Sequence, residues 1–163
     1  MRSPAHRSRF AVGIAGAIVV ILAAVVPVAA GSPRQVTIVS HVTFNPDGPN
    51  YGDFDATGAA VDDDVICPSG TFVDTGIRFA GFQSPRGVVQ LQVAKTFACD
   101  DGSGTFDVKM QIQADFGTGI ESFRWTVMRG TGAYGSLRGS GSGSTVPNPP
   151  IGNVNTFEGL LIH

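Results

Sequence analysis

The sequence predicts an all-β domain, and three observations carry that prediction. Beyond residue 30, apolar and polar residues alternate along several runs, and turn-forming residues separate the runs. No segment there repeats apolar residues with the 3.6-residue period of a helix. Strands at this spacing are typical of a sandwich or an antiparallel barrel. We therefore expect one all-β domain over residues 31–163, preceded by a signal peptide over residues 1–30.

The N-terminal segment has the pattern of an export signal. Three arginines and no acidic residue lie in the first nine positions, and an apolar run from Phe10 to Ala30 follows. Pro27 breaks this run, and Val28 and Ala30 fit the −3 and −1 positions of a signal-peptidase site. An uncleaved membrane anchor is the alternative, because about 20 apolar residues also span a bilayer. Both interpretations place the rest of the chain outside the cytoplasm, since the arginines stay inside.

Charge excludes two classes of partner. The signal segment holds three of the eleven basic residues and none of the thirteen acidic ones, so the remaining domain has eight basic residues and a formal net charge of −5. Such a domain lacks the basic patch that neutralises phosphates. We predict no nucleic-acid partner and, after cleavage, no membrane contact. We also predict no cofactor, because the glycine-rich stretches, such as Gly130-Thr131-Gly132, open no helix that could bind phosphate.

Each strand is assigned from its alternation and its flanking turns. In the first run, Val36, Ile38, Val42 and Phe44 lie on one face of the strand. In residues 106–114, the even-numbered residues are apolar and the odd-numbered residues are polar, so the two kinds lie on opposite faces. Turn sequences such as Asn45–Asn50 end the runs. The eight expected strands cover residues 36–44, 52–59, 71–82, 88–97, 106–114, 122–129, 137–145 and 156–162.

The end of the chain is expected to complete the same domain. The stretch Ser140–Pro150 is rich in Gly, Ser and Pro, but only thirteen residues follow it. We therefore interpret it as a glycine-rich strand followed by a loop. The last strand then closes the sheet and removes its exposed edge.

The two cysteines fit this strand order. Cys67 lies just before the strand 71–82, and Cys99 just after the strand 88–97. An antiparallel hairpin of these strands brings both cysteines to the end opposite its turn. An even number of cysteines in an exported chain favours a disulfide. Two reduced thiols remain an alternative, and a zinc site with His41 and His163 is a remote one.

One segment resembles a known family. The stretch Trp125–Gly141, with its Gly-Thr-Gly-Ala-Tyr turn, resembles the strand–turn–strand signature of bacterial secreted proteins related to allene oxide cyclase and dirigent barrels. The closing segment Thr156–Leu160 and the pairing of Ile66–Thr71 with Phe97–Gly102 are similar as well. The specific part of the resemblance is about twenty residues long, and it bears on fold more than on chemistry.

The resemblance implies an eight-stranded, calycin-type barrel with a small, often apolar interior. In characterised relatives the interior holds an oxylipin or a phenolic radical, and the protein often forms trimers, so a homotrimer is implied here. The catalytic acids and aromatics of the enzymes do not carry over by alignment. Glu158 is the one acid that we consider for the barrel interior, with a solvent-facing position as the alternative.

Acidic turns and a histidine are the remaining polar candidates. Asp62, Asp63, Asp64, Asp100 and Asp101 crowd the cysteine end, where a calcium site is one interpretation and solvated turns are the other. His41 is expected to be an exposed strand residue. No Gly-x-Ser-x-Gly motif accompanies it, which argues against a serine hydrolase.

The aromatic residues and the fold together suggest the function. An eight-stranded barrel is just wide enough to be filled by side chains or to hold one small ligand. We expect a candidate cavity lined by Glu158 and by six aromatic residues: Phe79, Phe82, Phe97, Phe106, Phe123 and Trp125. The first hypothesis is an exported binding module for a small apolar or phenolic ligand. The alternatives are a non-catalytic structural or interaction barrel of the cell envelope, and an enzyme of the dirigent or cyclase type.

Overall fold

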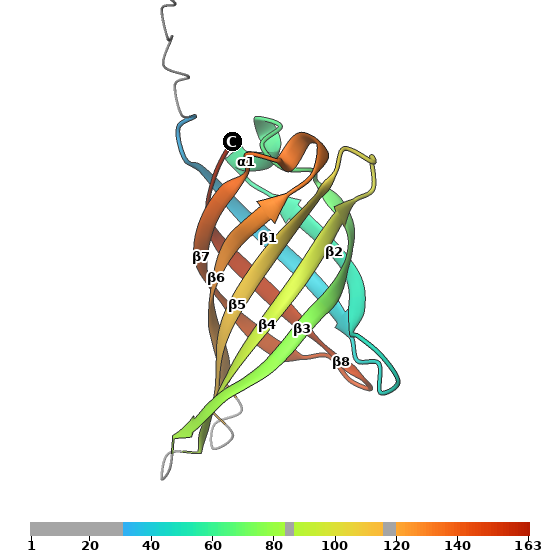
Figure 1. The fold of residues 1–163 in the computed structure, drawn as a ribbon, viewed down its shortest axis with the longest axis vertical. Helices are drawn as coiled ribbons and strands as arrows, with labels where there is room; N and C mark the ends of the chain where they lie inside the picture. The colour runs from blue at the N-terminus through green and yellow to red at the C-terminus, as the bar shows by residue number, and fades with distance from the viewer. Residues whose placement is uncertain (1–30, 84–86, 116–119) are drawn as a thin grey trace, which may run out of the picture.

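A computed structural model describes residues 31–83, 87–115 and 120–163. Eight antiparallel strands form one closed barrel (Figure 1), which confirms the predicted fold class. The predicted signal peptide lies outside the described residues. The strands are β1 (Arg34–Thr43), β2 (Tyr51–Thr57), β3 (Ser69–Gln83), β4 (Val88–Cys99), β5 (Thr105–Asp115), β6 (Ile120–Gly130), β7 (Arg138–Pro147) and β8 (Gly152–Ile162).

The strands form a meander in which each pairs with its neighbour in sequence, and β8 pairs with β1 to close the barrel. Hydrogen-bonded partners followed once around the barrel from Cys99 return to β4 at Val89, ten residues away. This stagger tilts the strands steeply against the barrel axis. β8 begins four residues before the expected strand, and β2 ends two residues earlier than expected.

Aromatic side chains fill much of the barrel interior. Phe97 stacks on Phe106 at 4.9 Å between ring centroids, and Phe54 meets Phe97 edge-on at 5.1 Å. Alternation along the strands places these rings inside and polar residues outside. On β7 three successive inner positions are glycines, Gly139, Gly141 and Gly143, and a Cβ on Gly143 would lie 2.3 Å from the ring of Phe123. The interior is therefore packed with side chains.

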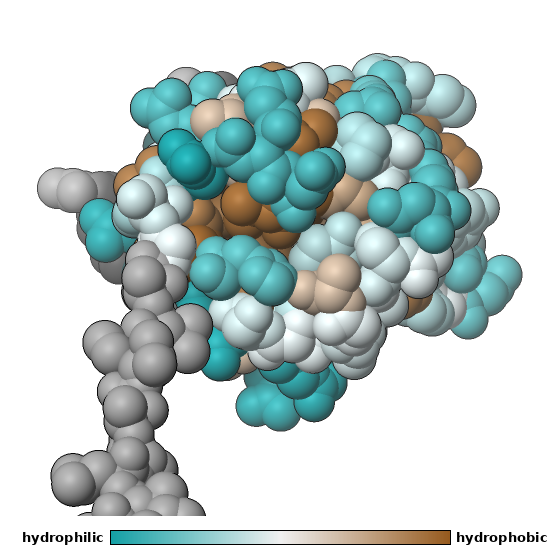
Figure 2. Space-filling view, turned by 90° about the horizontal axis from the view of Figure 1, so that it is seen from above, coloured by the Kyte–Doolittle hydropathy of each residue, from teal (hydrophilic) through white to brown (hydrophobic). Residues whose placement is uncertain are grey.

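The upper end of the barrel carries two short helices, α1 (Ala59–Asp62) and η1 (Gly132–Tyr134), and a disulfide. Cys67 and Cys99 are bonded, with their Cα atoms 6.0 Å apart, which confirms the expected pairing. Figure 2 views this end and shows apolar surface at its centre, bordered by polar residues. A buried disulfide is typical of proteins that mature in an oxidising, extracytoplasmic environment.

The lower end is uneven because the strands differ in length, with β3 the longest and β2 the shortest. β3 has 15 residues and β4 has 12, whereas β2 has seven. The hairpin of β3 and β4 therefore runs beyond the ends of β1 and β2 (Figure 1). Within the described residues, no helix is long and apolar enough to cross a membrane.

Candidate functional site

The projecting hairpin exposes apolar side chains on the inner face of the sheet. Ile77, Phe79 and Phe82 pair with Val93, Leu91 and Val89 of β4. Directly paired residues of antiparallel strands share a face, and Val93 is buried in the barrel. The three β3 side chains nevertheless keep 56%, 66% and 58% of their surface exposed. We call this set, Ile77, Phe79, Phe82, Val89 and Leu91, the lower apolar face.

This exposure corrects two predictions of buried aromatic residues. Phe79 and Phe82 have the inward orientation that their alternation indicated, but they are exposed rather than enclosed. The physical reason is the length of β3, which continues past Val73, the last residue that pairs with β2, so that Phe79 and Phe82 lie beyond the end of this neighbouring strand. A contiguous patch of solvent-exposed apolar side chains marks an interaction surface more often than single exposed apolar residues do.

The other aromatic candidates belong to the core. Phe97, Phe106, Phe123 and Trp125 are each at most 3% exposed, and their rings contact one another or neighbouring rings. They fill the barrel rather than line an open cavity. Glu158 is exposed on the outer face of β8, and its neighbour Phe157 points inward instead. The inward position considered for Glu158 is therefore wrong.

On five strands, buried polar residues lie between the aromatic core and the lower end. On β4, Lys95 stands one inner position below Phe97, and on β3, Asp74 stands one below Phe72. A buried polar residue occupies an inner position on β1, β7 and β8 as well. We call the buried polar residues of these strands the polar layer: Ser40, Asp74, Lys95, Thr145 and Asn155.

The centre of the polar layer is a buried ion pair. Lys95 Nζ lies 2.6 Å from Asp74 Oδ1, and both side chains are at most 4% exposed. Lys95 also lies over the ring of Phe72, at 4.3 Å from its centroid, and Asn50 donates to the second oxygen of Asp74 at 3.0 Å. Burial lowers the pKa of Lys95 from its usual 10.5, and the charge and hydrogen bond of Asp74 offset part of this effect.

The opposite wall of the barrel contributes hydrogen-bonding groups that are not fully used. Thr145 donates to Asn155 at 2.9 Å. Among the described residues, Ser40 Oγ and Asn153 Oδ1 are buried without a hydrogen-bond partner. Unpaired buried polar atoms cost free energy, so a water molecule or a bound polar group at these two atoms would be stabilising. This part of the barrel can accept or donate hydrogen bonds to a polar group.

A polar trough lies on the outer face of the sheet. It has a volume of about 740 Å³ and crosses β4, β5, β6 and β7. Its side chains are mainly amides and hydroxyls, with one cation; they include Gln90, Gln92, Gln111, Gln113, Ser122, Arg124 and Ser142. Leu91, Ile112 and Phe123 line the trough as well, so it offers apolar contacts beside its hydrogen-bonding groups.

The structure does not gather the five aspartates considered for calcium. Asp63 pairs with Arg34 at 2.8 Å, and Asp100 accepts a hydrogen bond from Ser69 at 2.8 Å. Asp101 accepts from Ser103, and these hydrogen bonds lower the pKa of Asp101. In the described part of the chain, none of the five belongs to a group of three or more converging ligand residues.

No protein-family model matches the chain, and no curated protein matches it.

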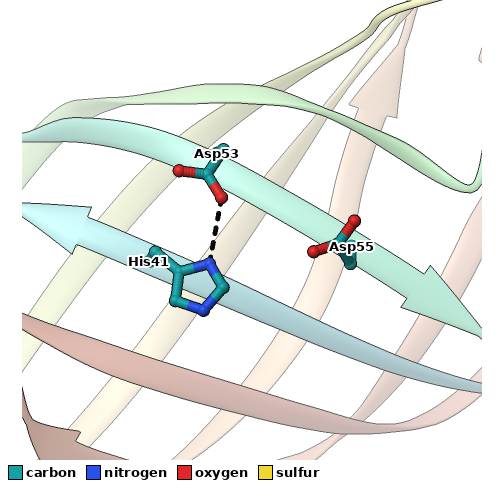
Figure 3. Close-up of side chains that lie close together, drawn as sticks. All are labelled: His41, Asp53 and Asp55. Carbon is teal, nitrogen blue, oxygen red and sulfur yellow. Dashed lines mark hydrogen bonds and ion pairs between the residues drawn. The ribbon is translucent and has the colours of Figure 1, made fainter.

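One polar cluster was missed by the sequence analysis. His41 on β1 lies opposite Asp53 on β2, and its Nδ1 is 2.9 Å from Asp53 Oδ2 (Figure 3). Asp55 is the next outward residue of β2, and one ligand atom from each of the three residues lies within 4.8 Å of the others. The alternation of Asp53 and Asp55 with Phe54 was a usable signal. Their approach to His41 depends on strand register, which the sequence does not state.

Proposed function

We propose that this protein is an exported binding module that holds a small molecule with an apolar or phenolic body at the lower end of its barrel. The observation that carries the proposal is the exposure of Ile77, Phe79 and Phe82 on an inward-facing surface. An apolar ligand placed there removes this surface from water, and each 100 Å² so covered contributes about 2.5 kcal/mol before the costs of binding.

The packing of the core supports a site at the barrel end rather than deep inside. The rings of Phe54, Phe97 and Phe106 contact one another, Phe157 contacts Phe97, and all four residues are at most 1% exposed. A ligand inside this cluster would have to displace closely packed rings. The lower apolar face needs no such rearrangement.

The polar layer supports a hydroxyl group on the ligand. Ser40 Oγ and Asn153 Oδ1 have unused hydrogen-bonding capacity on strands that reach the lower end. A phenol can both donate and accept a hydrogen bond, which matches a hydroxyl and an amide oxygen. The polar trough on the outer face is the alternative site, because its lining combines amides and hydroxyls with Leu91, Ile112 and Phe123.

Export is part of the proposal. The arginines, the apolar run and the site after Ala30 support a cleaved signal peptide. The Cys67–Cys99 bond supports the same compartment independently.

The competing function is a filled barrel that uses the lower apolar face to bind a protein, including a second copy of the chain. An apolar face of this kind suits both a ligand and a subunit interface. The trimer implied by the family resemblance belongs to this alternative. Oligomeric state therefore has to be measured together with ligand binding.

The experiment titrates purified protein with 4-propylphenol and with propylbenzene, which lacks the hydroxyl, while amide resonances are followed by NMR. We expect saturable shifts for residues 77–82 and 88–93, and weaker binding of propylbenzene. Phe79→Ala removes about 1–1.5 kcal/mol of ring contact and weakens binding about five- to tenfold. Met128→Ala is the matched control, since Met128 is 56% exposed on the outer face of β6.

Two outcomes would overturn the proposal. One is binding that Phe79→Ala leaves unchanged but Gln111→Ala weakens, which would move the site to the outer trough. The other is the absence of saturable binding, combined with a concentration-dependent oligomer in sedimentation that Phe79→Ala dissociates. That second result would assign the lower apolar face to a subunit interface.

A further inference from the structure

We propose that His41, Asp53 and Asp55 form a binding site for one divalent transition-metal ion of the zinc class on the outer face of β1 and β2. The proposal is independent of the ligand at the lower end, because it uses the opposite face of the barrel wall. Figure 3 shows the three side chains on two adjacent strands, with the imidazole turned toward Asp53.

The geometry is close to that of a metal centre without large movement. Zinc binds imidazole nitrogen and carboxylate oxygen at about 2.0–2.2 Å, so two donors on one ion lie about 3–3.5 Å apart. His41 Nδ1 and Asp53 Oδ2 are already 2.9 Å apart, and all three ligand atoms lie within 4.8 Å of one another. A rotation of the Asp55 carboxylate is the main adjustment required.

The register of the two strands holds the donors together. His41 is paired directly with Asp53, and Asp55 is two residues further along the same face of β2. Side chains at directly paired positions have Cβ atoms about 4.5–5.5 Å apart. Both strands are also paired on their other sides within the closed barrel, so the spacing of these donors is set by the fold.

The local charge favours a bound cation. Asp53 and Asp55 are like charges on adjacent outward positions, and His41 is the nearest basic group. Their cross-strand partners on β3 are Thr71 and Ser69, which carry no charge. Among the described residues, the Asp55 side chain has no hydrogen-bond or ion-pair partner. A divalent cation would relieve this repulsion, whereas no basic side chain in the described surroundings does so for Asp55.

The donor set selects the class of metal. One imidazole nitrogen and two carboxylate oxygens suit zinc and its first-row neighbours, with water completing the coordination. Calcium takes six to eight oxygen ligands, and this cluster offers only two carboxylates beside a nitrogen. The site therefore differs in kind from the calcium site considered for the acidic turns.

The test is calorimetric titration of chelator-treated, untagged protein with zinc chloride, followed by cobalt chloride with visible spectroscopy. We expect one zinc equivalent per chain and a cobalt d–d absorption band. Asp55→Asn keeps the size of the side chain and weakens zinc binding about tenfold or more. Asp47→Asn is the matched control, because Asp47 is an exposed aspartate of the β1–β2 connection that lies outside the cluster.

A second variant and a second observable keep the result decisive. His41→Gln also loses binding, and thermal melts of both variants without metal stay within a few degrees of wild type because all three side chains lie on the surface. With wild-type protein, paramagnetic cobalt broadens the amide resonances of residues 39–41 and 53–55 before those of residues 77–82. The proposal is overturned by the absence of one-to-one binding, or by binding that Asp55→Asn and His41→Gln leave unchanged.

Discussion

Replacing Lys95 by methionine tests the polar layer directly. Lys95 Nζ lies 2.6 Å from Asp74 Oδ1, and both side chains are almost fully buried. Methionine at position 95 therefore leaves the Asp74 carboxylate buried with only Asn50 as a side-chain partner. Breaking a buried pair in this way costs about 3–5 kcal/mol. In a domain of this size the melting temperature falls by about 10–20 °C. The double variant Lys95→Met/Asp74→Asn removes both charges, keeps an acceptor for Asn50, and recovers most of the loss.

The pH dependence of the same variant supplies an independent check. Burial lowers the pKa of Lys95 below 10.5, while the unfolded chain keeps the ordinary value. Between these two pKa values the unfolded chain binds more protons, so the free energy of unfolding rises with pH. The cost of burying the charged lysine is fully present below the lowered pKa and is gone above 10.5. The difference between wild type and Lys95→Met therefore grows as pH rises through this window.

Urea denaturation followed by tryptophan fluorescence measures both effects, since Trp125 is 2% exposed in the core. Lys109→Met is the matched control, because Lys109 lies on the outer face of β5 and its replacement changes stability by about 0.5 kcal/mol or less. A loss below about 1 kcal/mol for Lys95→Met would refute the reasoning. So would a double variant no more stable than the single one.

Two further predictions concern the barrel wall and its cross-link. Gly143→Ala forces a Cβ to within 2.3 Å of Phe123 and of the Thr156 carbonyl oxygen, and costs about 1–3 kcal/mol or more in thermal melts, whereas outward Ser142→Ala is nearly neutral; equal effects of the two would contradict the assigned faces of β7. Cys67→Ala/Cys99→Ala opens a loop with a sequence separation of 32 residues and lowers the free energy of unfolding in urea by about 3–4 kcal/mol, so a loss under 1 kcal/mol would count against a stabilising role.

The fold was predictable because local patterns agree with one another. Alternation in residues 36–44 and 106–114 located β1 and β5, and the cysteines flanking the 71–97 hairpin indicated its antiparallel pairing. The glycines of β7 resembled a linker in composition. Their place in a strand followed from the short segment after them, and they leave room for neighbouring side chains: Gly143 for Phe123 and Gly139 for Leu161.

The candidate site was less predictable because it depends on strand lengths and register. Alternation correctly gave the face of Phe79, but exposure depends on how far β3 outruns β2, which no local pattern encodes. Glu158 and Phe157 alternate equally well in either orientation, so only the pairing of β8 with β1 decides which one points inward. Lys95 and Asp74 are 21 residues apart, and a buried ion pair is invisible until their strands are paired in register.

The closing seam of the barrel has a consequence for how the protein is made. β1 pairs with β8 over ten residue pairs, from Arg34 with Leu161 to Thr43 with Gly152. β1 can therefore pair with β8 only after nearly the whole chain has been synthesised. Contacts of such long sequence separation form slowly. A nascent chain that stops before residue 152 keeps two unpaired strand edges, which are templates for aggregation.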